Sequence, residues 1–426
     1  MSTSQPLPFL ESQDPKIFSA IRSEEDREAH GLELIPSENY VSQPVHEAMG
    51  SVFTNKYSEG YPHKRYYGGQ QFTDEIEEIA IERARKLFNC KYANVQPHSG
   101  APANIGAYYA LCEAGDTILG MDLSHGGHLT HGHPVTHITK SFNFVRYKMK
   151  DPETGEIDYD ALRETALKEK PKLILAGFSA YSRELDYQRF VDIAHEVGAY
   201  TMADMAHIAG LIAGKAAKNP FDFGFDVITT TTHKTLRGPR GGMILIRDNE
   251  EIAKKIDKSI FPGLQGGPHM HIVAAKAVCF GEALTPEFQA YAQQVLKNAK
   301  AMEQVFREKK VRMLGGGTDN HLILADVYGS LGITGQEAED VLDEVGITLN
   351  KNSIADEPRS MFDPSGIRFG TPAITTRGFD EADCTHVAEL MIEAMTHRDD
   401  AAVKEKIREE IRGMAIAKPI PDRFVK

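Results

Sequence analysis

Residues 226–235 read Asp226-Val227-Ile228-Thr229-Thr230-Thr231-Thr232-His233-Lys234-Thr235, and a Gly- and Pro-rich segment follows at 236–242. The β-branched run predicts a buried strand, and the segment after it predicts a tight loop. Lys234 is therefore expected where the strand gives way to the loop. Desolvation and nearby cations can lower the pKa of such a lysine, and a neutral amine can form a Schiff base with an aldehyde. The alternative is a lysine that only extends its charged end into solvent.

Composition is that of a soluble globular protein. The 426 residues suggest two or three domains, and the hydrophobic content of 41% and charged content of 26% are ordinary. The net charge of −13 disfavours nucleic acid or an anionic membrane as the main partner, because both attract basic surfaces.

The four cysteines, at positions 90, 112, 279 and 384, are far apart and form no C-x-x-C pair. They indicate neither a disulfide framework nor a zinc finger, and a reducing compartment fits best. Residues 1–20 lack the order of a secretory signal, and no run approaches ~20 apolar residues. We expect a cytoplasmic protein.

Short apolar runs alternate with helical stretches through the middle of the chain. The runs cover 117–121, 142–147, 173–177, 199–204, 226–231 and 243–247. Strands that are apolar on both faces and separated by helices predict an α/β fold with a mostly parallel sheet. Helices are expected at 73–88, where Thr73 or Asp74 would cap the start, and at 186–197, which ends at Gly198.

We expect three parts: an N-terminal arm at 1–50, a large domain at 51–285 and a small C-terminal α+β domain at 286–426. A short helical stretch is expected around 17–27 in the arm, and a long polar-faced helix at 286–309 marks the second boundary. In the small domain, strands are expected at 321–327, 347–350 and 366–369.

Asp204 ends the run 199–204, much as Lys234 follows the run 226–231. In open α/β sheets, ligands bind beyond the carboxyl ends of the strands, so both side chains are expected at one edge. A lysine there can hold an aldehyde while an acid pairs with a protonated pyridine nitrogen, as pyridoxal phosphate requires. The alternative for Asp204 is a helix N-cap.

Two other segments fit a phosphate-bearing cofactor. Small residues at 99–104 open a helical stretch, where free backbone N–H groups can bind phosphate; a simple helix cap is the alternative. Five histidines crowd into 125–137 at spacings that could supply metal ligands. Because H-E-x-x-H is absent and the segment itself contains no Cys or acidic residue, we expect one histidine that stacks on a flat cofactor, and no metal site.

Two segments favour binding of a small substrate. Arg368 lies among glycines close to a predicted strand, which suits bidentate binding of a carboxylate, with a surface salt bridge as the alternative. The Gly- and Tyr-rich segment 55–69 is expected at an interface or a site wall rather than in a core.

Together these segments resemble the serine hydroxymethyltransferase family over nearly the whole chain, from residue 35 to residue 375. The most specific matches are Thr-Thr-Thr-Thr-His-Lys at 229–234, Asp-Met-Ala-His at 204–207, His-Gly-Gly-His at 125–128 and Asn-Lys-Tyr-Ser-Glu-Gly-Tyr at 55–61. The resemblance implies the aspartate aminotransferase-like architecture called fold-type I, with a seven-stranded, mostly parallel sheet in the large domain. It also implies a homodimer with shared active sites, with tetramers in some members.

The resemblance also assigns roles to residues. Lys234 would form the Schiff base with pyridoxal 5′-phosphate, Asp204 would hold the pyridinium nitrogen, and His128 would stack on the ring. The other cofactor-binding residues would be Ser99, Gly100, Ala101, Ser179, His207, His233, Tyr57 and, from the partner subunit, Gly267. The substrate would be bound by Ser37, Tyr67, His207, Arg368 and Glu59. Tetrahydrofolate would contact Leu123, Gly127, Asn352, Tyr66 and Glu59.

Within this set the catalytic residues would be Lys234, Glu59, His233, Asp204 and Thr231. Glu59, arriving from the partner subunit with Tyr57 and Tyr67, would move the proton of the serine hydroxyl. The chain departs from familiar members at position 101, which is Ala instead of Ser, and at His63, where Gly is common. Because a neutral hydrogen bond contributes ~0.5–1.5 kcal/mol net, we expect cofactor affinity to be several-fold lower.

The implied reaction is reversible transfer of the hydroxymethyl group of L-serine to tetrahydrofolate, giving glycine and 5,10-methylenetetrahydrofolate in one-carbon metabolism. The alternative within this chemistry is an aldolase or hydroxymethyltransferase for another β-hydroxy amino acid, such as threonine or α-methylserine. Two other classes are a metal-dependent hydrolase built on the histidines and a non-catalytic RNA-binding protein, which the acidic charge disfavours.

Overall fold

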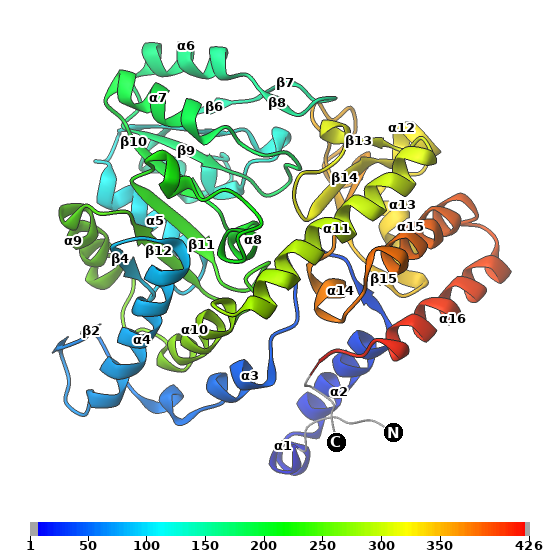
Figure 1. Ribbon diagram of the computed structural model, residues 1–426, viewed down its shortest axis with the longest axis horizontal. Coiled ribbons are helices and arrows are strands. Elements are labelled where there is room, and N and C mark those ends of the chain that lie inside the picture. The colour runs from blue at the N-terminus through cyan, green and yellow to red at the C-terminus, as the bar shows by residue number, and fades with distance from the viewer. Residues whose placement is uncertain (1–6, 422–426) are drawn as a thin grey trace. The chain divides into compact units, whose positions relative to one another are not determined.

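The computed structural model describes residues 7–421. The chain divides into two compact units (Figure 1). Pro44–Gln293 form one, here called the central unit, and the segments Met1–Gln43 and Gln294–Lys426 form the other, the terminal unit. The first six residues of the predicted arm lie outside the described residues. The domain boundaries expected at 50 and 285 stay a prediction, because compactness alone does not test independent folding.

The central unit is built on a seven-stranded sheet in the order β4-β12-β11-β10-β9-β5-β6. Its strands are β4 (Tyr92–Asn94), β5 (Thr117–Met121), β6 (Asn143–Tyr147), β9 (Leu173–Gly177), β10 (Tyr200–Asp204), β11 (Val227–Thr231) and β12 (Gly242–Ile246). β12 runs opposite to the other six strands of this sheet. The predicted mostly parallel sheet is therefore confirmed. The sequence missed β4, because three residues with one buried side chain carry no periodicity.

The central unit also contains helices, most of which lie around the sheet (Figure 1). They are α3 (Gln43–Met49), α4 (Gln71–Phe88), α5 (Gly100–Leu111), α6 (Tyr159–Glu169), α7 (Tyr187–Val197), α8 (Ala209–Ala213), α9 (Glu250–Lys258) and α10 (Met270–Ala283). Shorter elements are the strand pairs β2 (Gly60–Tyr61) with β3 (Lys64–Arg65) and β7 (Met149–Asp151) with β8 (Glu156–Ile157), and the turns η1 (Val52–Asn55), η2 (Leu123–His125), η3 (Leu129–His131), η4 (His137–Lys140), η5 (Pro220–Phe223) and η6 (Ser259–Leu264).

Helix α4 begins two residues before the predicted start, and its predicted cap is wrong. Gln70 occupies the N-cap position and makes no side-chain cap bond. Thr73 instead donates from its hydroxyl to the Gln70 carbonyl, 2.8 Å away, and Asp74 accepts from Arg65 at 2.9 Å. Both side chains therefore serve contacts that the local sequence does not show.

One face of the sheet packs against α5 and α9. Leu173 and Leu175 of β9 belong to a buried cluster with Ala107 and Tyr108 of α5 and Ile256 of α9. Because side chains alternate along a strand, the residues between them point to the opposite face. The same alternation decides which polar side chains at the strand ends face α5.

The terminal unit contains an antiparallel sheet in the order β13-β14-β17-β16 and a separate parallel pair, β1 with β15. The strands are β1 (Leu32–Glu33), β13 (Arg312–Met313), β14 (Leu322–Asp326), β15 (Ile347–Thr348), β16 (Asn350–Asn352) and β17 (Gly366–Gly370). The single strand predicted at 347–350 is wrong, since this segment divides between β15 and β16 in two sheets.

Helices surround these strands. They are α1 (Pro8–Gln13), α2 (Pro15–His30), α12 (Val327–Leu331), α13 (Gly335–Glu344), α14 (Pro372–Thr376), α15 (Glu381–Thr396) and α16 (Ala401–Ala417), with the turn η7 (Leu314–Gly316). The predicted long helix is confirmed as α11 (Pro286–Glu308), which carries the chain from one unit to the other. Within residues 7–421, no helix is long and apolar enough to cross a membrane.

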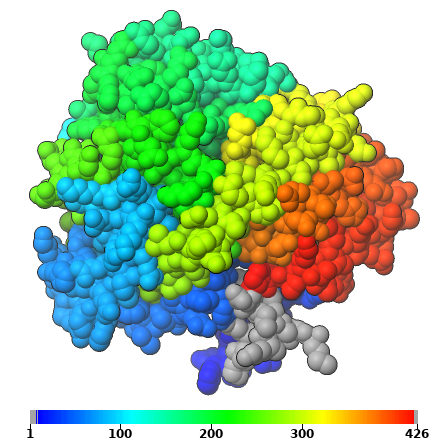
Figure 2. Space-filling model, in the orientation of Figure 1, coloured from blue at the N-terminus to red at the C-terminus, as the bar shows by residue number. Residues whose placement is uncertain are grey.

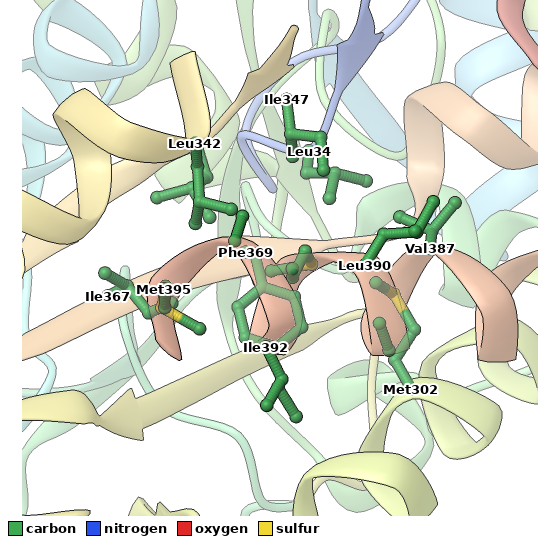
Figure 3. Close-up of a cluster of buried hydrophobic side chains, with 14 of the residues drawn as sticks. Leu34, Met302, Leu342, Ile347, Ile367, Phe369, Val387, Leu390, Ile392 and Met395 are labelled. Carbon is green, nitrogen blue, oxygen red and sulfur yellow. The ribbon is translucent and has the colours of Figure 1, made fainter. Parts of the chain in front are cut away.

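The core of the terminal unit is a cluster of fully buried side chains from the strands and from α11, α13 and α15 (Figure 3). Phe369 of β17 has no exposed surface and stacks at a tilt on Phe306, with 4.8 Å between ring centroids. The cluster also holds Leu34, so the segment after β1 is part of this core.

Phe369→Ala should lower the free energy of unfolding by about 3–5 kcal/mol, because it removes a buried aromatic ring and leaves a cavity. The matched control is Phe362→Ala, since Phe362 is 88% exposed and should lose almost nothing. Urea unfolding followed by circular dichroism measures both. Equal losses in the two variants would contradict this account of the core.

Candidate active site

Asp204 and Lys234 come from neighbouring strands. β10 and β11 pair in parallel, with Asp204 opposite Thr229, and Lys234 follows Thr231, the last residue of β11, by three positions. The structure therefore brings both residues to the carboxyl edge of the sheet. The register also places Asp204, Thr229 and Thr231 on the face that packs against α5, because their side chains share one alternation.

Asp204 is the centre of a buried hydrogen-bond network. One carboxylate oxygen lies 3.0 Å from His131 Nε2 and accepts from Asn104 at 2.8 Å. The other oxygen accepts from the Ala206 backbone N–H at 3.1 Å. The His128 backbone N–H donates to His131 Nδ1 at 3.1 Å, so in the neutral imidazole the proton is on Nε2 and points at Asp204.

This network keeps the Asp204 carboxyl ionised. Burial alone would raise its pKa, but the hydrogen bond from His131, the charges of His131 and His128 and the bond from Asn104 together hold the pKa well below its ordinary value. A buried carboxylate at a strand end is able to stabilise a cation on a bound ring.

The sequence did not assign His131 and Asn104 to this network. Asn104 lies four residues after Gly100 and faces the sheet, where its amide oxygen accepts from Thr229 at 2.6 Å and its nitrogen also donates to Thr130 at 2.8 Å. The available signal was helical spacing, which puts positions 100 and 104 on one face.

The predicted phosphate site lies at the start of α5. Ser99 is the N-cap, in extended conformation, and its side chain makes no capping bond. The first N–H groups of the helix have no partner within the helix, as at any helix start. A β-carbon on Gly100 would come 2.8 Å from Thr231 Cγ2, so this backbone lies against the end of β11 and suits the close approach of an anion.

The loop that carries Lys234 closes on itself. The Gly238 N–H donates to the Thr232 carbonyl at 2.7 Å, and the Thr232 hydroxyl donates to the Pro239 carbonyl at 2.5 Å. Thr235 donates from its hydroxyl to the His207 carbonyl at 2.8 Å. Lys234 therefore lies in a loop whose two ends and middle are hydrogen-bonded.

His233 is held neutral in this loop. Burial, with the charges of Lys234 and Arg240, lowers the pKa of His233 to about 3. Its Nδ1 atom is buried without a hydrogen-bond partner among the described residues. An orphaned buried nitrogen beside the Schiff-base candidate fits a ligand that supplies the missing bond.

The loops after β5 and β9 contain other predicted residues. The Ser179 N–H donates to the Gly126 carbonyl at 2.7 Å, so the loop of Leu123 and Gly127 is joined to the loop of Ser179. His128 Nδ1 lies 2.7 Å from the Thr130 hydroxyl, and the charge of His128 acts on Asp204. These positions agree with a ring-stacking role for His128, which stays a prediction.

A second cluster joins the Tyr-rich loop to the segment around Gly267. Glu59 accepts from the Tyr57 hydroxyl at 3.2 Å and from the Tyr67 hydroxyl at 3.3 Å, and its charge and hydrogen bonds raise the pKa of both phenols. A β-carbon on Gly267 would come 3.5 Å from the Tyr57 ring. The four residues expected to serve a partner's site are thus grouped together.

This cluster is exposed in the single chain. Tyr57, Tyr66 and Tyr67 are 58%, 69% and 50% exposed, and Tyr66 packs edge-on against Phe261, with 5.5 Å between centroids. Residues 44–90, blue in Figure 2, form one continuous stretch of the surface of the central unit. Exposed aromatic rings gathered in one loop are typical of an interaction surface.

Three predicted residues belong to the terminal unit. Arg368 of β17 donates to the Asn350 side chain at 3.1 and 3.2 Å, and burial lowers its pKa to about 10, so the guanidinium stays charged near neutral pH. Asn352 of β16 lies opposite Gly366 of β17. A β-carbon on Gly370 would come 2.7 Å from Pro36 Cβ, which places the segment of Ser37 beside the end of β17.

His131 and His128 of the histidine-rich segment act on Asp204. Among residues 7–421, no group of three or more His, Cys, Asp or Glu side chains could hold a metal ion.

A Schiff-base lysine candidate, an ionised buried aspartate and a small-residue helix start at one edge of a mostly parallel seven-stranded sheet define a pyridoxal phosphate enzyme of fold-type I. Residues 10–391 match the model of the family described as serine hydroxymethyltransferase. The chain belongs to this family, whose members use pyridoxal phosphate and take tetrahydrofolate as co-substrate. It is a transferase of serine, glycine and one-carbon metabolism in this broad sense.

The low pKa of His233 gives a pH-dependent stability. A histidine that titrates near 6.5 when unfolded and near 3 when folded stabilises the fold above pH 6.5, and this contribution is lost as pH falls toward 3. The loss approaches about 1.4 kcal/mol per pH unit within that window. In the apoprotein, melting temperatures measured from pH 7 to pH 5 should therefore fall less steeply for His233→Gln than for wild type.

The exposed His397 provides the control, because His397→Gln should leave the wild-type slope unchanged. If the melting temperature of His233→Gln falls with pH as steeply as that of wild type, the account of His233 as a buried, neutral imidazole is contradicted.

Proposed function

We propose that the chain transfers the hydroxymethyl group of L-serine reversibly to tetrahydrofolate, giving glycine and 5,10-methylenetetrahydrofolate. The observation that carries the proposal is the buried carboxylate of Asp204, which His131 and Asn104 keep ionised. Asp204 ends β10, and the neighbouring strand β11 leads to Lys234. Membership of the family supports the reaction class.

The central unit supplies the groups that a pyridine-aldehyde cofactor requires. When bound, pyridoxal phosphate supplies an electron sink for the pair left when the Cα–Cβ bond breaks. Lys234 would hold the aldehyde, Asp204 would keep the ring nitrogen protonated, and His128 would lie against the ring. The backbone of Ser99, Gly100 and Ala101 would bind the phosphate, with His233 donating or accepting through its orphaned nitrogen.

Substrate selection is proposed to depend on the positive charge of Arg368 and on the carboxylate of Glu59. The charged guanidinium of Arg368, with Ser37, would hold the amino acid's carboxylate and so decide which bond lies perpendicular to the ring. Both carboxylate oxygens of Glu59 accept hydrogen bonds from phenols, those of Tyr57 and Tyr67, which fixes the orientation of the side chain. It would take the proton of the serine hydroxyl, as a general base.

Glu59 is proposed to act in the site of a second copy of the chain. Its cluster is exposed, aromatic and contiguous with Gly267, as expected for a surface that a homodimer buries. Active sites shared across a two-fold interface follow from that arrangement. The four cysteines are free thiols, which supports the cytoplasm as the compartment.

The second candidate is cleavage or hydroxymethylation of another β-hydroxy amino acid, such as threonine or α-methylserine. The same lysine, aspartate and arginine would serve that reaction, and the space around Thr231 and His131 would select the substrate. Both are buried, at 7% and 1% exposure, which favours a small substrate side chain.

Purified wild-type enzyme with pyridoxal phosphate, L-serine and tetrahydrofolate should form glycine, and Lys234→Ala should lose nearly all turnover because nothing else holds the aldehyde. The exposed Lys150→Ala is the control and should keep wild-type activity. Glycine is measured by chromatography.

The same assay with threonine and α-methylserine separates the two candidates. Faster turnover on either amino acid than on serine, or glycine formation from serine that does not respond to tetrahydrofolate, would favour the second candidate over the transferase.

Shared sites predict complementation between two inactive variants. Glu59→Gln alone should lower kcat by about 10²–10⁴-fold, the usual loss for a proton-transfer group. Co-expression with Lys234→Ala should restore about a quarter of wild-type activity, because half of the dimers are mixed and each mixed dimer has one site with both groups intact.

Glu59→Gln co-expressed with Tyr67→Phe is the control, because these two residues come from the same loop. In a mixed dimer each changes a different site, so activity should not exceed the mean of the two variants. Failure of the first pair to complement would contradict the shared site and would leave the reaction itself to the previous assay.

A further inference from the structure

Lys276 is a buried lysine to which the proposed chemistry gives no role. It lies on α10 with a residue exposure of 1%. Its ammonium donates to three backbone carbonyls, those of Val95 at 2.7 Å, Pro97 at 3.1 Å and Gly242 at 2.7 Å. All three donors of the ammonium are thus used, and none of them bonds to a side chain.

The charge of Lys276 lacks a direct counter-ion in the described part of the chain. Glu77 is near enough to raise the pKa of Lys276, but its carboxylate binds Arg65 at 2.6 Å and Gln96 at 2.7 Å. Burial lowers the pKa of Lys276 to about 7, while the three carbonyl dipoles favour the charged form. A buried ammonium of this kind is costly unless an anion comes close.

By binding all three carbonyls, the ammonium connects the two segments of the proposed cofactor site, the one that leads to Ser99 and the one that follows the loop of Lys234. Val95 and Pro97 precede Ser99 in the segment between β4 and α5. Gly242 begins β12, directly after the loop of Lys234.

The packing around Gly242 and Lys276 leaves little free space. The Gly242 N–H donates to the Pro97 carbonyl at 3.0 Å, and a β-carbon on Gly242 would come 2.4 Å from the Ser99 carbonyl oxygen. A β-carbon on Gly241 would come 2.5 Å from Lys276 Cε. A small movement of Lys276 would therefore displace the backbone that leads to Ser99.

We propose that Lys276 is a positioning residue for the cofactor phosphate: its ammonium fixes the backbone leading to Ser99 and Gly100, and its buried charge favours a dianion there. The inference rests on the proposed phosphate site at Ser99, Gly100 and Ala101. Lys276 itself touches protein carbonyls only, so it acts through the backbone and through its field.

The test compares two ligands of the apoprotein, pyridoxal 5′-phosphate and pyridoxal, which differ by the phosphate alone. Lys276→Met removes the charge and the donors with little change in side-chain volume. The measured quantity is the affinity for pyridoxal 5′-phosphate divided by the affinity for pyridoxal. Lys276→Met should lower this ratio by about tenfold or more, mainly because binding of pyridoxal 5′-phosphate weakens. Both dissociation constants are measured by fluorescence titration, and circular dichroism confirms folding.

Val273→Ala is the matched control, since Val273 is buried on the same helix and should lower stability without changing the ratio. Ser99→Ala tests the phosphate site itself and should lower the ratio as well. If the ratio is unchanged in Lys276→Met but lowered in Ser99→Ala, the role of Lys276 is overturned and the proposed phosphate site is kept. Unchanged ratios in both overturn the phosphate site too.

A second variant, Lys276→Gln, keeps one donor group and removes the charge, and it should lower the ratio even where the methionine variant does not fold. Equal loss of affinity for both ligands in either variant would assign Lys276 a general structural role and overturn the proposal. So would failure of both variants to fold.

Discussion

The register between β10 and β11, with Asp204 opposite Thr229, decides which side chains face α5. A shift of one residue would place Asp204 and Thr231 on opposite faces of the sheet, so that only one of them could face Asn104 and the helix start at Gly100. Hydrophobic burial fixes this register, since every residue of β11 is buried and Val227 belongs to the cluster beneath α5. The chemistry at the sheet edge is therefore aligned by apolar packing several residues away.

The polar residues of the site form a network that is costly if incomplete. Asp204 is buried, and its charge is tolerated because His131, Asn104 and a backbone N–H all bond to it. Asn104 in turn bonds to Thr229 and Thr130. The Nδ1 atom of His233 is an exception, because it is buried without a hydrogen-bond partner among the described residues. The ammonium of Lys276 has all three donors bonded to backbone carbonyls, but no counter-ion lies directly beside it in the described part of the chain. A ligand can supply the missing hydrogen bond at His233, and an anion near Lys276 can balance its charge.

Much of the central sheet was predictable from sequence, because runs such as 173–177 and 227–231 are apolar or β-branched throughout. The strand ends that carry Asp204 and Lys234 followed from the same pattern. His131 and Asn104 could not be assigned, since their partner Asp204 is distant in sequence and their spacing is shared with ordinary helix and turn positions. The division of 347–350 between two sheets was also hidden, because the partner of β15 is β1, which lies far away along the chain, whereas β16 pairs with β17. The grouping of Glu59 with Gly267 is a contact of the same long-range kind.

β12 makes one pairing that is local in sequence and one that is distant, and the two are expected to form at different stages of folding. β11 and β12 form a hairpin, with Thr231 opposite Gly242, so the lysine loop closes between strands that are near in sequence. The pairing of β12 with β4, at Ile244 and Asn94, joins segments far apart along the chain. Local hairpins form faster than contacts that must close long loops. The lysine loop is thus expected to order early and the phosphate-binding backbone late, so a chain that captures its cofactor has already completed the most distant pairing in this sheet.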